Sequence, residues 1–159
     1  MRRLVVVSLL VFPFLLGCVS DMPQSRLGNP IAAHKVLIAA QDTSFKHKVL
    51  TAVVDKLGTT DFNYQVVGLS QLAGQDVAEY GVILIMSPIE GGIIDKRIGS
   101  FLEKDPSNPK AIVLYTYGIQ SLKDKIKWDY KVDAVSSASV ESLAPTVSDQ
   151  LVAFIKTRF

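Results

Sequence analysis

Apolar runs that alternate with helical stripes constrain the fold of this chain most. Val82–Met86 is a continuous apolar run of strand length, and Val36–Ala40 and Ala111–Tyr115 are of the same kind. A strand that is apolar throughout needs both of its faces covered, which is typical of a parallel sheet with helices on each side. Between the first runs, apolar residues recur at helical spacing and stop before Gly58, which suits a helix end. This first helical stripe comprises Phe45, Val49, Ala52, Val53 and Leu57.

The remaining segments continue the alternation to the end of the sequence. Further strands are expected over 64–69 and 132–135, and further helices over 94–102, 121–127 and 147–155, the last with Pro145 in its first turn. Five such strand–helix units over residues 34–159 predict a single α/β domain. The predicted architecture is a doubly wound, five-stranded parallel sheet in a three-layer αβα sandwich.

The N-terminus carries a different signal. Arg2 and Arg3 precede an apolar stretch, 4–16, that is too short to span a bilayer as a mature helix. It ends in Leu15-Leu16-Gly17-Cys18, which resembles the lipobox of bacterial lipoproteins. The resemblance implies that residues 1–17 form a signal peptide that is removed and that Cys18 becomes an acylated, palmitate-bearing N-terminus. The alternative is an ordinary signal peptide or signal anchor in which the cysteine is there by chance.

An acylated Cys18 would make a membrane the first partner of this protein. The expected location is the bacterial cell envelope. Lipoproteins in which the residue after the cysteine is not aspartate are commonly sorted to the outer membrane, so Val19 favours the periplasmic face of that membrane. Residues 18–33 are rich in turn and breaker residues without periodicity, so they are expected to form a flexible tether. Such a tether would reach roughly 20 Å.

Composition excludes several functions. Without Arg2 and Arg3, the chain has 15 Lys and Arg residues and 15 Asp and Glu residues, so the mature chain is formally neutral. No nucleic-acid partner is therefore expected. Cys18 is the only cysteine, so an acylated chain has no disulfide and no thiolate nucleophile. The two histidines, His34 and His47, have no spacing suited to a metal ion or to base catalysis. Ser87 lacks the flanking glycines of a hydrolase elbow. Whether the protein is an enzyme stays open.

The domain resembles a short-chain flavodoxin over most of residues 34–159. Three segments carry the resemblance: Lys35–Ala39 leading into a helix, Glu79–Gly92, and Ala111–Gly118. The resemblance implies the strand order 2-1-3-4-5. In that order a ligand binds beyond the carboxyl ends of the first and third strands, where the winding of the chain reverses.

The resemblance also implies an FMN site built from three loops. Asp42, Thr43 and Ser44 stand where flavodoxins hold the FMN phosphate at a helix N-terminus. The other loops contribute Ser87, Pro88, Ile89 and Gly91, and Thr116, Tyr117 and Gly118, with Tyr117 placed to stack on the flavin ring. The first loop departs from the family pattern because Ser44 replaces a glycine and the Asp42 carboxylate lies near the helix end. A solvated helix face is expected for the three basic residues Lys46, His47 and Lys48.

Two functions from different classes remain open. The first is a membrane-anchored FMN protein that transfers electrons or reduces a quinone-like partner at the envelope. The second is a flavodoxin-like domain without a cofactor that acts as an envelope binding or assembly module. The partner would be an envelope redox protein in the first case and an assembly protein in the second.

Overall fold

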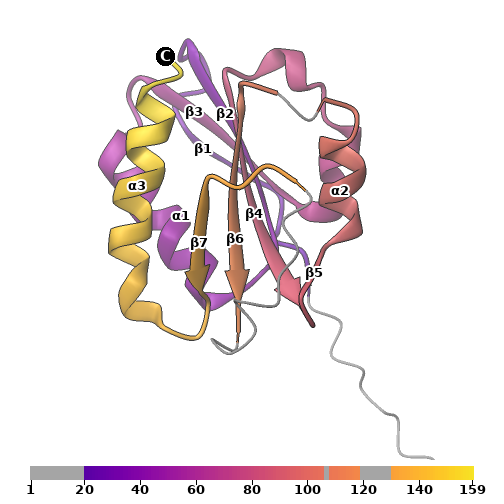
Figure 1. The fold of residues 1–159 in the computed structure, drawn as a ribbon. Helices are drawn as coiled ribbons and strands as arrows, with labels where there is room; N and C mark the ends of the chain where they lie inside the picture. The colour runs from indigo at the N-terminus through magenta and orange to yellow at the C-terminus, as the bar shows by residue number, and fades with distance from the viewer. Residues whose placement is uncertain (1–19, 106–107, 119–129) are drawn as a thin grey trace, which may run out of the picture.

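The computed structural model describes residues 20–105, 108–118 and 130–159, and within them one mixed sheet runs through the molecule (Figure 1). The sheet has seven strands in this part of the chain, in the order β1-β3-β2-β4-β6-β7, with β5 paired to β4. The strands are β1 (Ser25–Gly28), β2 (His34–Ala40), β3 (Phe62–Gly68), β4 (Val82–Glu90), β5 (Ile93–Ile94), β6 (Ala111–Tyr117) and β7 (Ala134–Ser137). The helices are α1 (Ser44–Leu57), α2 (Lys96–Leu102) and α3 (Ala144–Lys156).

The parallel part of the sheet confirms the predicted topology. Strands β3, β2, β4, β6 and β7 are mutually parallel and adjacent in that order, which is the expected order 2-1-3-4-5. Two strands were not predicted. β1 adds to β3 in antiparallel fashion at one edge, and β5 forms a hairpin with β4.

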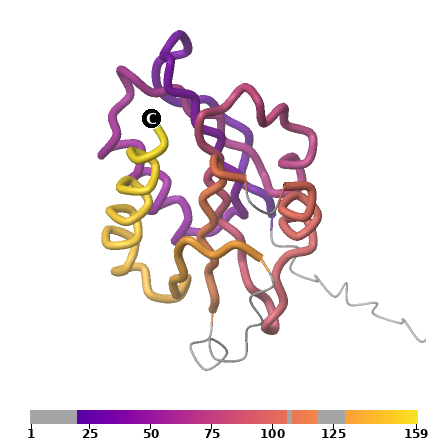
Figure 2. Tube along the Cα trace, turned by 45° about the horizontal axis from the view of Figure 1, so that its top comes forward, coloured from indigo at the N-terminus to yellow at the C-terminus, as the bar shows by residue number. Residues whose placement is uncertain are grey.

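The core lies on both faces of the sheet, as continuous apolar strands require. Successive residues of β2 point to opposite sides: Ile38 packs in the cluster under α1 and α3, and Leu37 packs in the cluster under α2. Helices α1 and α3 lie side by side on the first face, and α2 covers the second together with a 3₁₀ helix over Leu69–Gly74 (Figures 1 and 2). This is the predicted three-layer sandwich. The helix expected over 121–127 lies outside the described residues.

The ends of α1 follow from local chemistry. The Thr43 hydroxyl accepts a hydrogen bond from the backbone N–H of Lys46 at 3.3 Å, which caps the helix N-terminus. Gly58 ends the helix with a φ of 82° and donates its N–H to the Val54 carbonyl at 2.8 Å. The first turn of α1 therefore begins directly at the edge where the parallel strands end, called here the carboxyl edge.

The N-terminal segment differs from the flexible tether that the sequence predicts over 18–33. From Ser20 onward it is bound to the domain, and Met22 is buried in the core cluster under α1 and α3. β1 then follows along β3. The sequence gives little sign of this because every residue of β1 is exposed, so backbone hydrogen bonds rather than apolar side chains hold the strand. Residues 20–28 are called the strap below.

Within the three described ranges, no helix is both long enough and apolar enough to cross a bilayer.

Candidate functional site

The carboxyl ends of β2 and β4 form the switch point at which a doubly wound sheet binds its ligand. β2 ends at Ala40 opposite Met86, whereas β4 continues to Glu90. Side chains of the chain itself fill the space on the α1 side of the longer strand, and a hollow of about 370 Å³ lies at its end beside β5 and the start of α2. Gln41 and Lys46 are both buried there.

Lys46 is the central group of this site. Its side chain is fully buried, and its Nζ donates to Gln41 Oε1 at 2.9 Å. Gln41 in turn points its Nε2 toward Glu90 Oε1, at a long 3.5 Å. The prediction of a solvated face is therefore wrong for Lys46, although His47 and Lys48 are exposed as expected. The reason is direction: a side chain in the first turn of a helix leans back toward the helix N-terminus, which carries this amine into the crevice.

The burial of Lys46 changes its titration. Burial lowers the pKa of the Lys46 amine to about 8, while the carboxylates of Glu90 and Asp95 oppose the shift and the charge of Arg97 adds to it. Arg97 is itself neutralised, since its guanidinium bonds Asp95 at 2.5 Å and Asp21 at 3.1 Å. The crevice thus already contains two cations, Lys46 and Arg97, and the carboxylates of Glu90, Asp95 and Asp21.

In the loop predicted to hold a phosphate, the polar groups are hydrogen-bonded to other groups of the protein. The Asp42 N–H donates to the Ser20 carbonyl at 2.8 Å, and the Ser44 hydroxyl donates to Glu141 Oε1 at 2.7 Å. The Asp42 carboxylate lies 2.7 Å from His47 Nε2. With the Thr43 hydroxyl already capping α1, the three predicted residues are all placed at the helix end, but each is bonded to another part of the protein. The carboxylates of Asp42 and Glu90 would also repel a phosphate, so the residues present do not fit the phosphate of FMN.

Asp21 is a site residue that the sequence reasoning missed. Its carboxylate accepts the backbone N–H groups of Leu69 at 3.1 Å and Ser70 at 3.0 Å, in addition to its contact with Arg97. Burial raises the pKa of Asp21, but the hydrogen bonds from Ser70 and the charge of Arg97 outweigh it and leave the pKa below its ordinary value. A Cβ on Gly68 would lie 2.3 Å from the Asp21 Cβ, so a glycine is needed under this contact. A lone aspartate among turn residues gave no signal of this role.

The second predicted loop is a strand and a tight hairpin. Ser87, Pro88 and Ile89 are buried in β4 and pair with β6, and the Ser87 hydroxyl donates to the adjacent Pro88 carbonyl at 3.1 Å. Gly91 and Gly92, at φ 59° and 82°, form the two-residue turn into β5. The prediction of a loop is therefore wrong for Ser87, Pro88 and Ile89, which lie in β4, whereas Gly91 does lie in a turn. Two consecutive glycines before Ile93 and Ile94 are the hairpin signal that was available in the sequence.

The third predicted segment ends the sheet. Thr116 is buried and its hydroxyl donates to the Ser87 carbonyl at 3.3 Å. Tyr117 is the last residue of β6 and only 8% exposed, so it offers little of its ring to a ligand from solvent. The Gly118 carbonyl accepts a hydrogen bond from the Ser139 hydroxyl at 2.9 Å. The structure thus brings these residues beside the β4 strand, as predicted, but buries two of the three.

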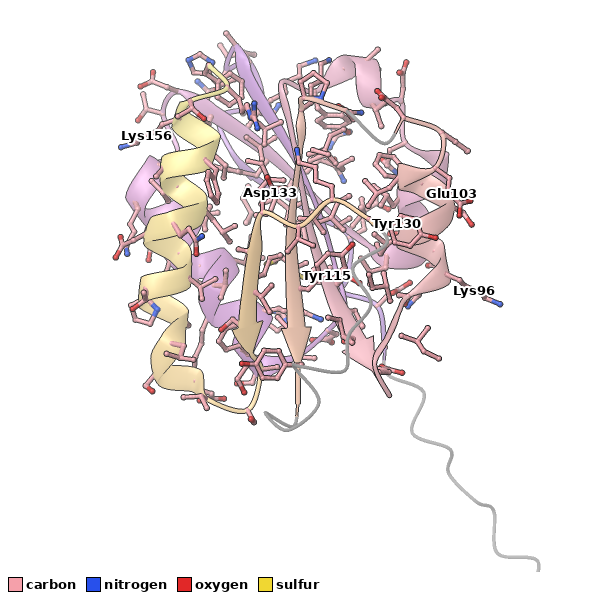
Figure 3. The ribbon with its side chains drawn as sticks, in the orientation of Figure 1. Lys96, Glu103, Tyr115, Tyr130, Asp133 and Lys156 are labelled. Carbon is pink, nitrogen blue, oxygen red and sulfur yellow. The ribbon has the colours of Figure 1, made fainter. Side chains whose placement is uncertain are left out.

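A second set of polar groups lies away from the crevice, with Tyr115 and Tyr130 between β6 and α2 and Asp133 directly before β7 (Figure 3). The Tyr130 hydroxyl donates to Glu103 Oε1 at 2.9 Å, and Asp133 accepts the Val113 N–H at 2.9 Å. Burial, with the nearby Tyr130 and Asp133, raises the pKa of the Tyr115 hydroxyl. These contacts join structural elements and suggest no chemistry. In the described ranges no group of three or more histidine, cysteine or acidic side chains is placed to hold a metal ion.

Comparisons with known proteins agree with the topology. No family model and no curated protein matches this chain. Among solved structures, oxidised flavodoxin 2 from Bacillus cereus has a TM-score of 0.52 at 11% identity, over 80% of this chain and 100% of that one. The two-electron reduced flavodoxin of Megasphaera elsdenii gives 0.51 at 19% identity, over 76% and 98%. The metal-soaked Flv1 flavodiiron core from Synechocystis sp. PCC6803 gives 0.53 at 12% identity, over 80% of this chain but only 36% of its own.

At these identities the likeness shows the fold alone. This chain therefore has a flavodoxin-like fold, in which a strap and a buried lysine occupy the crevice at the switch point.

Proposed function

We propose that this protein is a lipid-anchored lipoprotein of the bacterial envelope whose flavodoxin-like domain is a binding or assembly module that uses no FMN. The observation that carries the proposal is the self-filled crevice, in which Lys46 and Gln41 are buried where a flavin phosphate would be expected. Fold likeness alone cannot assign the cofactor, because function depends on the site rather than on the fold.

The energetics of the strap support this proposal. Admitting a phosphate at the end of α1 requires the Asp42 N–H to leave the Ser20 carbonyl. It would also disturb Asp21, which holds two backbone N–H groups and Arg97. Hydrogen bonds to a charged group are worth about 1.5–3 kcal/mol each. A ligand that displaced the strap would have to offset these bonds and the exposure of buried Met22.

The charges at the crevice also support a domain that does not bind FMN. A phosphate dianion is stabilised by free N–H groups and by cations that are not already paired. Here Arg97 is paired with two carboxylates, and Lys46 is buried against Gln41. Asp42 and Glu90 add negative charge on either side. The carboxylates thus already outnumber the cations without a ligand.

The anchor is proposed from the lipobox that ends at Cys18. Its test is the mass of the N-terminal peptide from protein isolated from bacterial membranes, together with partition of the protein into detergent. The expected result is a diacylated or triacylated Cys18 and loss of partition in Cys18→Ala. An unmodified Cys18, or partition that Cys18→Ala retains, would overturn the anchor.

The cofactor is tested by titrating the purified mature protein with FMN and following the flavin fluorescence. We expect no saturable quenching up to about 1 mM. A matched variant, Asp42→Thr with Ser44→Gly, removes the carboxylate and restores the glycine of the family pattern, and it separates loop chemistry from the strap because it leaves Ser20 and Asp21 in place. Saturable binding to the unaltered protein at micromolar FMN would refute the proposal and favour membrane-anchored electron transfer instead.

A further inference from the structure

We propose that the carboxyl edge of the sheet lies directly against the lipid bilayer, with the tip of the β4–β5 hairpin inserted among the lipids. This inference rests on the lipid anchor proposed above. It adds an orientation and a contact surface, which an anchor on a flexible tether would not fix.

The first argument is the length of chain between the anchor and the folded domain. Ser20 is already held at the carboxyl edge, since its carbonyl accepts the Asp42 N–H at 2.8 Å. Two residues later, the Met22 N–H donates to the Ala40 carbonyl at 3.1 Å. Only Val19 separates Cys18 from Ser20, and two residue steps span at most about 7 Å. An acylated Cys18 therefore keeps this edge within about 7 Å of the lipid attachment point.

The second argument is that the strap is firmly attached. The Asp21 carboxylate bonds the backbone at Leu69 and Ser70 and the guanidinium of Arg97, and Met22 is only 3% exposed. These contacts lie on the 3₁₀ helix over Leu69–Gly74, on α2 and in the core under α1 and α3 rather than on one flexible loop. The attachment point is thus a fixed corner of the domain.

The third argument is the surface that this edge presents. Ile93, at the tip of the hairpin, is 73% exposed, and Val140 and Leu143, in the connection from β7 to α3, are 40% and 38% exposed. In Figure 1 the hairpin and this connection lie at the same end of the molecule, where the arrowheads of β4, β6 and β7 point, and the C-terminus lies at the opposite end. Single exposed apolar residues are common on proteins, but these three share the edge to which the anchor is joined.

The charges along the edge suit a bilayer without net charge. Asp42 lies 2.7 Å from His47 Nε2, Glu141 is paired with Lys48, and one exposed charge of each sign, Glu90 and Lys96, flanks the hairpin. No unpaired basic cluster is present among these residues to demand anionic lipid. The proposed partner is therefore a zwitterionic lipid surface, bound through apolar contact and the anchor.

The test uses the full lipidated protein in phosphatidylcholine–phosphatidylethanolamine vesicles that carry doxyl-labelled lipid. An acylated Cys18 has no free thiol, so Ile93→Cys introduces the only thiol that an environment-sensitive maleimide dye can label. Thr59→Cys places the same dye in the connection from α1 to β3 at the opposite edge. We expect a blue-shifted dye at position 93 that doxyl lipid quenches several-fold more than the dye at position 59.

The controls distinguish the possible failures. If the dye labels the chain that has no introduced cysteine, Cys18 is free and the anchor itself is refuted. If Cys18 is acylated but positions 93 and 59 are quenched equally, the orientation is wrong while the anchor stands. A flexible ten-residue insertion between Val19 and Ser20 keeps the lipid and should remove the quenching difference; an unchanged difference would contradict the short-anchor argument. If the thiol introduced by Ile93→Cys is protected from the maleimide dye in cells but not in vesicles, the edge binds a protein partner rather than lipid.

Discussion

Replacing the buried lysine, Lys46→Met, tests the arrangement of the crevice through the pH dependence of stability. The amine is fully buried, and its pKa lies at about 8 in the folded protein against 10.5 for the unperturbed group. Each pKa unit corresponds to about 1.4 kcal/mol, so keeping Lys46 charged in the fold reduces the free energy of unfolding by about 3 kcal/mol at neutral pH.

The sign of the pH dependence follows from proton counting. Because the folded pKa of Lys46 is lowered, the unfolded chain binds more protons between about pH 8 and 10.5, and stability rises with pH in that window. Methionine has a similar length and does not titrate. The stability of Lys46→Met relative to the unaltered protein should therefore fall by about 2 kcal/mol between about pH 7 and 9.5.

Comparing Lys46→Met with the unaltered protein cancels the contribution of other titrating groups to the pH dependence of stability. Burial raises the pKa of Tyr64 to about 12, and the pKa values of Tyr80 and Tyr115 are also raised. These groups lower stability as pH rises through 10 in both proteins, so they cancel in the difference. Loss of the hydrogen bond to Gln41 changes the size of the difference at every pH but not its slope.

The assay is urea denaturation followed by circular dichroism at several pH values. Lys48→Met is the matched control, because Lys48 is a neighbouring exposed lysine on the same helix. Its difference from the unaltered protein should be flat over the same pH range. A flat profile for Lys46→Met as well would refute the reasoning, since it would mean that Lys46 is solvated in the folded protein.

Three further substitutions test the strap, the hairpin and the end of α1. Asp21→Ala removes the acceptor for two backbone N–H groups and should lower the free energy of unfolding by about 2 kcal/mol in urea denaturation; an unchanged midpoint would show that the strap is not attached. Gly91→Ala should lower it by about 1 kcal/mol because φ is +59° there with open space around, whereas Gly74→Ala, also in open space, should be neutral; equal effects would contradict the turn geometry. Tyr64→Phe loses a 2.7 Å hydrogen bond to the Gly58 carbonyl and should lower it by about 1 kcal/mol, and no loss would mean that water replaces the bond.

The sequence predicts the parallel sheet well because its signal is strong and local. Apolar runs such as Val82–Met86 can be buried in only a few ways, and the stripes between them fix where the helices lie. β1 gives no such signal, since all its side chains are exposed and its pairing with β3 uses backbone groups that every residue possesses. β5 has only two residues, so a periodic pattern cannot reveal it.

The sequence predicts where the candidate site residues lie but not which of their polar groups are free to bind a ligand. Thr43 and Tyr117 do lie at the ends of β2 and β6, because topology brings those ends together. Whether a polar side chain there is free or bonded depends on partners distant in the chain. Ser44 bonds Glu141, 97 residues away, and Asp21 bonds Leu69, 48 residues away. The sequence predicts Lys46 in solvent because lysines are rarely buried, and its hydrogen bond to Gln41 and the nearby carboxylates of Glu90 and Asp95 offset the cost of burial.

The strap connects the two proposals for this protein. A helix N-terminus and the carboxyl ends of parallel strands leave backbone groups that need partners, and in ligand-binding relatives of this topology the ligand supplies them. Here Ser20 and Asp21 supply part of that bonding from within the chain. The same residues lie two and three positions after Cys18, so under the anchor proposed above the segment bonded at the crevice would also bring the lipid to it. The two proposals together predict a coupling: freeing the edge from the bilayer and opening the crevice would each require the strap to detach.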